Sequence, residues 1–164
     1  MPMPTFFAGA PLAASDLNLL SAQIDSLTAP GWVDYSGTFT LTSSGTNPTK
    51  GNSTYKALYR RPAGADLIDV KILVIIGTSF VVGTGDYRFS LPFNAHADEL
   101  TGGVGELYHL DASPGTNHAG ICYPAAAGYL SCIDDGVANF LGAANPVVPA
   151  VNDTYRLFYS YRPA

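Results

Sequence analysis

The stretch LIDVKILVII, Leu67–Ile76, contains the longest apolar run in a chain of 164 residues. Its nearly continuous apolar character is typical of a strand at the centre of a sheet, covered on both faces. The run Ile72–Ile76 is far too short to span a bilayer, so membrane insertion is not expected. The sequence therefore predicts a central β-strand here.

On both sides of this strand, apolar and polar residues alternate with the period of two that is typical of half-buried strands. Glycine, proline and asparagine stand at the breaks, which indicates roughly eight to ten short strands. We expect one domain, residues 31–164, built as an antiparallel β-sandwich of jelly-roll type. The alternating segments are Thr38–Thr42, Ser53–Arg60, Asp86–Phe93, Gly105–Leu110, Gly128–Ile133, Val137–Gly142 and Thr154–Pro163.

The composition supports this fold and excludes some functions. Charged residues make up only 13% of the chain and hydrophobic residues 47%, which favours a packed β-domain over a disordered chain. The net charge is −5 with eight Lys and Arg residues, too few for a basic face that neutralises phosphates. We therefore expect no nucleic-acid partner.

Residues 1–30 differ from the rest of the chain, and we expect them to form an extended arm followed by one short amphipathic helix. Ser15 is a good N-cap, and Pro30-Gly31 ends the helical pattern. The apolar positions are spaced three, four and three apart, which gives a narrow seam rather than a broad stripe: Leu17, Leu20, Ile24 and Leu27.

A helix of about 12 residues is marginal alone in water, so its apolar seam must be covered. Two arrangements remain open from the sequence. The helix packs on its own β-domain, or copies of it pack together about a symmetry axis or into the groove of a partner; the narrow seam favours the second arrangement. The prolines of the preceding arm favour an extended segment. Its residues Phe6 and Phe7 are expected to dock in a pocket or to cover the bottom of the β-domain, and Leu12 is assigned with them to attachment.

The segment FFAGAPLAASDLNLL, Phe6–Leu20, resembles the opening of many tailed-bacteriophage appendage proteins. In those proteins an aromatic residue and a short Ala-Gly turn precede a Leu-x-Ala-x-Asp-Leu-Asn stretch that leads into a helix. The resemblance implies that residues 1–30 are the attachment end of a protein that is commonly a trimer.

A second resemblance covers Gly31–Phe93. This segment contains, in order, a tryptophan near the start, Gly-Asn-Ser, a strand ending in Tyr-Arg-Arg, a long apolar strand, GTS and GTGDYRFSLP. This pattern is similar to a module of virion proteins from phages of Actinobacteria. It implies a non-enzymatic virion protein, made in the host cytoplasm, whose partners are further copies of itself and the major capsid or tail proteins.

Two roles on a virion stay open. The short chain without a shaft favours capsid decoration and stabilisation. The alternative is a minor tail or fibre protein that binds a host-surface glycan or receptor. For that role we single out Tyr108, Tyr123 and Tyr129, which lie in the half without the resemblance, because exposed tyrosines favour recognition. The alternating tyrosines Tyr55, Tyr59, Tyr155 and Tyr159 are expected to be core residues.

No catalytic, cofactor or metal motif is found in the sequence. Gly45–Thr54 has the wrong order for a phosphate-binding loop, and the three histidines, His96, His109 and His118, follow no metal-ligand spacing. We expect no enzyme activity. The less favoured reading is a virion-associated hydrolase, for which His109 and Asp111 would be the first residues to test.

Two cysteines, Cys122 and Cys132, are ten residues apart and could face each other across a hairpin. The sequence leaves open whether they form a disulfide or remain buried thiols.

Overall fold

The computed structural model describes residues 31–62, 65–134, 140–144 and 148–164, and in these ranges the regular secondary structure is β-strand apart from one short 3-10 helix. The predicted arm and helix, residues 1–30, lie outside the described residues. The elements are β1 (Val33–Asp34), β2 (Leu41–Ser43), β3 (Thr54–Arg60), β4 (Ile68–Ile75), β5 (Tyr87–Ser90), η1 (Ala97–Thr101), β6 (Gly105–Asp111), β7 (Thr116–Ala126), β8 (Tyr129–Asp134) and β9 (Thr154–Tyr161).

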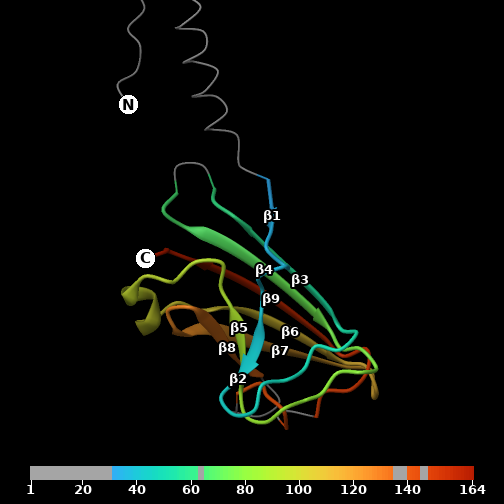
Figure 1. Cartoon of the computed structure of the whole chain (residues 1–164). Coiled ribbons are helices and arrows are strands. Elements are labelled where there is room, and N and C mark those ends of the chain that lie inside the picture. The colour runs from blue at the N-terminus through green and yellow to red at the C-terminus, as the bar shows by residue number, and fades with distance from the viewer. Residues whose placement is uncertain (1–30, 63–64, 135–139, 145–147) are drawn as a thin grey trace, which may run out of the picture.

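The strands form one sheet in the order β1-β3-β4-β9-β6-β7-β8-β5-β2, and the paired neighbours run antiparallel. Figure 1 shows this sheet curled, so that β2 and β5 lie over the inner face of the strands from the other half. The prediction of a mostly β, antiparallel domain is confirmed.

The strand predicted to be central is β4, which pairs with β3 on one side and β9 on the other. Every second side chain of β4 faces the inside of the curl: Val70, Ile72 and Val74 are all at most 2% exposed. On the outer face, Lys71 is exposed, while Leu73 and Ile75 are only half-buried. Among the described residues, β4 is therefore fully covered on its inner face only. The prediction of cover on both faces holds for that face alone.

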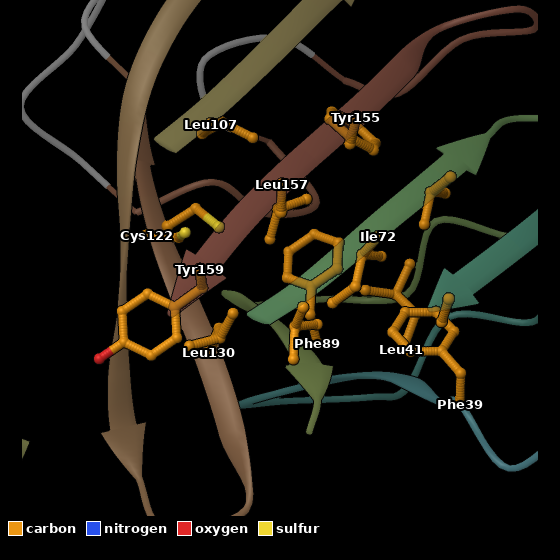
Figure 2. Close-up of a cluster of buried hydrophobic side chains, with 14 of the residues drawn as sticks. Phe39, Leu41, Ile72, Phe89, Leu107, Cys122, Leu130, Tyr155, Leu157 and Tyr159 are labelled. Atoms are coloured by element: carbon orange, nitrogen blue, oxygen red, sulfur yellow. The ribbon is translucent and has the colours of Figure 1, made fainter. Parts of the chain in front are cut away.

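The core fills the inside of the curl. Figure 2 shows Phe89 from β5 and Leu41 from β2 meeting Ile72 from β4, with Leu157 and Tyr159 of β9 beside them. Large apolar and aromatic side chains from both ends of the sheet thus bury one another, which is the main stabilising contribution. The tyrosines expected in the core lie there: Tyr155 and Tyr159 are buried, and Tyr55 and Tyr59 pack against the cluster.

The segment between β1 and β2 joins the two ends of the curled sheet. The backbone N–H of Tyr35 donates to Ala57 of β3 at 2.9 Å, and the N–H of Ser90 of β5 donates to Thr40 at 3.0 Å. The Phe39 ring meets Tyr55 edge to face, 5.6 Å between centroids. The strand predicted over Thr38–Thr42 begins only at Leu41, because the N–H groups of Thr38 and Phe39 donate to the Tyr35 carbonyl in a turn, each at 3.0 Å.

The two loops that carry Gly-Asn-Ser and GTS are bonded to each other. Asn52 Nδ2 donates to Thr78 Oγ1, and Asn52 Oδ1 accepts from the N–H and the hydroxyl of Ser79, each at 2.9 Å. A Cβ on Gly77 would lie 2.3 Å from Asn52 Oδ1, so only glycine fits there. These residues hold the β2–β3 and β4–β5 loops together.

Asn52→Ala should therefore lower the free energy of unfolding by about 1–2 kcal/mol, because it removes three side-chain hydrogen bonds at a partly exposed site. Urea unfolding followed by circular dichroism measures this. Asn117→Ala is a matched control at an exposed position near the start of β7, where the amide oxygen accepts a hydrogen bond from the Tyr108 hydroxyl. A loss no larger than in the control would show that the loop network contributes little.

Candidate functional site

The residues predicted to attach the protein lie outside the described residues: Phe6, Phe7, Leu12, Leu17, Leu20, Ile24 and Leu27. Their roles stay predictions. The residues predicted to bind a ligand, in contrast, are all described.

Tyr108, Tyr123 and Tyr129 lie on the neighbouring strands β6, β7 and β8, but each has a different partner. The Tyr108 hydroxyl donates to Asn117, the Tyr123 ring lies 6.1 Å from that of Phe140, and the Arg88 guanidinium lies 4.8 Å over the Tyr129 ring. Among the described residues no ring contact joins two of the three tyrosines, so they do not form one aromatic platform.

Tyr108 nevertheless lines the principal hollow of the described surface, which has a volume of about 700 Å³. We call it the outer groove. It runs across the outer face of the sheet, over β3, β4, β9, β6 and β7. The outward-facing side chains that line it are Leu58, Leu73, Phe158, Tyr108 and Ala119, with Lys56, Lys71, Arg156 and Glu106 around them.

Apolar and charged side chains alternate on the outward positions of the central strands, and the apolar ones form the floor of the outer groove. In the strand register Lys71 is opposite Leu58 and Phe158, while Glu106 is opposite Phe158. Leu58, Leu73 and Phe158 therefore lie on adjoining strands of one face and are each half-buried. Their common surface continues to Ile121 of β7, which is 43% exposed.

The charged groups around the groove are mainly cationic: Lys56, Lys71 and Arg156 against Glu106. Lys56 Nζ lies 3.2 Å from the Asp34 carboxylate. Hydrogen bonds from Ser36, together with Lys56, lower the pKa of Asp34 to about 2, so this carboxylate stays charged at neutral pH. Arg156 lies 5.5 Å over the Tyr108 ring.

Trp32, the single tryptophan of the chain, lies at one end of the outer groove. The Lys71 ammonium is 4.3 Å from its ring centroid and the Arg60 guanidinium is 4.8 Å from it. Arg60 is in turn held by Asp69, whose carboxylate accepts from Arg60 Nε at 2.8 Å. The indole is thereby fixed against the outer face of β3 and β4, where the described chain begins.

An apolar hollow with few polar groups suits the binding of an apolar surface rather than of a small polar substrate. The sequence reasoning missed Leu58, Leu73 and Phe158 as site residues. A signal was present for Leu73 alone, in the apolar run of Leu67–Ile76, which predicted a strand covered on both faces.

The histidine singled out for an enzyme reading, His109, lies in the core. It is fully buried, and its Nδ1 lies 2.9 Å from Oδ2 of Asp134, which is 1% exposed. The His118 ring stacks on it at 5.2 Å, and the Tyr155 ring lies 4.7 Å away. Asp111 does not join this cluster through a hydrogen bond; its carboxylate accepts from the N–H of Ser113.

Cys122 and Cys132 are register partners across the β7–β8 hairpin, as their spacing suggested, and both are buried free thiols in the structure. Burial raises the pKa of the Cys132 thiol, with the neighbouring Cys122 and Asp134 acting in the same direction.

Within the described residues, no three His, Cys, Asp or Glu side chains are grouped so that they could hold a metal ion. No helix in the same ranges is long and apolar enough to cross a membrane.

Comparisons with models of known protein families, with curated proteins and with solved structures found no match.

Proposed function

We propose that this chain is a non-enzymatic structural protein of a tailed-phage virion, working as a homotrimer anchored by residues 1–30. Its partners are the major capsid or tail proteins, and its first role is capsid decoration and stabilisation. The β-domain, which we take to be related to jelly-roll domains, would project from the particle.

One observation carries this proposal: the residues that resemble the virion module contact one another. Trp32 packs on Arg60 of the Tyr-Arg-Arg motif, and Asn52 of Gly-Asn-Ser bonds Thr78 and Ser79 of GTS. The residues that carry the resemblance thus include contacting pairs, which supports treating them as one module in this proposal.

A minor tail or fibre protein that binds a host glycan is the second candidate. The observation that favours it is Tyr108, which is 38% exposed beside Arg156 and Asn117. An aromatic face beside polar side chains is a common arrangement for sugar recognition, and three copies would add avidity to weak contacts. Tyr123 and Tyr129 have other partners and do not extend the aromatic surface around Tyr108, so the surface available for a sugar is small.

The virion-associated hydrolase is the least supported of the three. His109 has no exposed surface, so a polymer outside the protein cannot reach its imidazole in this conformation.

Immunogold electron microscopy of purified phage particles, with antibody against residues 32–164, tests the proposal. Label over the head is the expected result and would identify a decoration protein. Label at the tail end would favour host contact instead. Intact particles without label, in a preparation where the antibody binds the purified protein, would contradict a surface role on the virion.

A further inference from the structure

The outer face of the central strands is too apolar to be a simple solvent-facing surface. The inward residues of β4 are buried, yet two of its four outward residues, Leu73 and Ile75, are also apolar, the other two being Asp69 and Lys71. Phe158 of β9 and Leu58 of β3 line the same hollow as Leu73. A sheet with one solvated face normally alternates apolar and polar residues. The sequence of β4 is instead that of a strand with a second cover.

The place where the described chain begins indicates what the cover is. Trp32 is fixed by Lys71 and Arg60 at one end of the outer groove. Leu27, the last apolar residue of the predicted helix, is five residues earlier, a reach of at most about 17 Å. Pro30-Gly31 between them favours a turn that could fold the preceding segment back over the sheet.

The dimensions of the segment and the groove agree. A helix over residues 15–27 is about 20 Å long at 1.5 Å per residue. The groove crosses five adjacent strands, β3 to β7 in sheet order, and four strand spacings span about 19 Å. The seam of Leu17, Leu20, Ile24 and Leu27 covers about 15 Å of this length and would thus lie over most of the apolar floor.

The charges also agree. The only charged side chains in residues 1–30 are Asp16 and Asp25, which are both acidic. Three of the four charged groups around the groove are cationic, and Lys71 lies at the end near Trp32, where Asp25 would come. The pairing is favourable and adds direction to an otherwise apolar contact.

We propose that the outer groove is the seat of residues 15–27 of the same chain. The segment lies across β4 and its neighbours as an amphipathic helix, with the seam on Leu58, Leu73 and Phe158 and its C-terminal end beside Trp32. A tether of a few residues gives this partner a high effective concentration, so the same chain outcompetes a second copy. Attachment to a larger assembly then falls to the arm before the helix, with Phe6, Phe7 and Leu12.

This seat does not rest on the proposed virion role, and it excludes packing of the same seam about a symmetry axis. Cysteine cross-linking of the purified full chain tests it. Ile24→Cys combined with Leu73→Cys is expected to form a disulfide within one chain on oxidation. The control pair, Ala22→Cys with Leu73→Cys, places the thiol on the opposite side of the helix and should not cross-link.

Non-reducing electrophoresis separates the outcomes. A monomer with altered mobility in the Ile24 pair alone supports the seat. Cross-linked dimers would make a second copy the occupant, and equal or absent cross-linking in both pairs would mean that the groove does not receive this segment; either result overturns the proposal. Failure of immunogold labelling on phage, in contrast, would leave this result unchanged.

Fluorescence of Trp32 provides a second readout that needs no cysteine. Leu20→Asp puts a charge into the seam, so the segment should leave the groove, and acrylamide quenching of Trp32 should increase with a red shift of its emission. Ala22→Asp carries the same charge on the other side and should change neither. Identical quenching in the two variants and the wild type would overturn the proposal.

Discussion

Asp134→Ala should lower the free energy of unfolding by about 3–5 kcal/mol, because it leaves the fully buried imidazole of His109 without its carboxylate partner. Both side chains are inaccessible to solvent, so water cannot replace the lost bond. The His118 ring, stacked on His109 and 3.5 Å from the other carboxylate oxygen, loses its contact as well. Urea unfolding followed by circular dichroism measures the change.

Asp98→Ala is the control for this prediction. Its carboxylate pairs with Arg162, but its side chain is 74% exposed. Surface pairs of this kind contribute about 0–1 kcal/mol. A double replacement, His109→Leu with Asp134→Leu, should recover part of the loss, because neither polar group is then left unpaired. If Asp134→Ala were as mild as Asp98→Ala, the buried pair would have no structural role.

The second large effect is a loss of stability in alkaline solution. Burial raises the pKa of Tyr55 and Tyr161 to about 12, and it raises the pKa of Tyr35, Tyr87, Tyr155 and Tyr159 still further. In the unfolded chain these phenols ionise near their ordinary value of 10.0. The folded state therefore binds more protons than the unfolded state once the pH exceeds about 10.

This sets the sign and the range of the effect. The contribution of these tyrosines to stability is complete below pH 10 and is lost as the pH rises toward about 12 and above. Absorbance at 295 nm and circular dichroism, recorded on the same samples, should show late phenol ionisation that coincides with unfolding. Ionisation of most tyrosines near pH 10 with an intact circular dichroism spectrum would contradict the packing described for the core.

The sequence predicted those strands in which apolar residues face one side and polar residues face the other. The strands β3, β5, β6, β8 and β9 lie where the alternation placed them, and β4 is central as its apolar run indicated. Alternation works in these cases because successive side chains point to opposite faces and only one face enters the core.

The sequence did not predict β7, the longest strand, Thr116–Ala126. Gly120 and Pro124 interrupt its apolar pattern, and both are usually signals of a loop. The structure gives reasons for both. A Cβ at Gly120 would lie 2.2 Å from the Ile133 carbonyl oxygen, so glycine permits close approach of β8. Pro124 lies where the register shifts at a bulge, a place that tolerates the missing N–H.

The candidate site was only partly predictable. Tyr108 was selected as an exposed aromatic residue, and it does line the outer groove. The apolar floor was not foreseen, because Leu58, Leu73 and Phe158 come from three strands whose order depends on long-range pairing. Likewise, His109 and Asp134 are 25 residues apart and meet only because β6 and β8 both flank β7.

The most direct test of the proposed seat is nuclear Overhauser spectroscopy on the full chain with labelled Leu, Ile and Val methyl groups. We predict contacts from the methyl groups of Leu20 and Ile24 to those of Leu58 and Leu73. In a sample that mixes labelled and unlabelled protein, these contacts should arise within one chain. Contacts of Leu20 and Ile24 only with the same residues of other copies would instead show a helical seam about a symmetry axis, with the outer groove left to another partner.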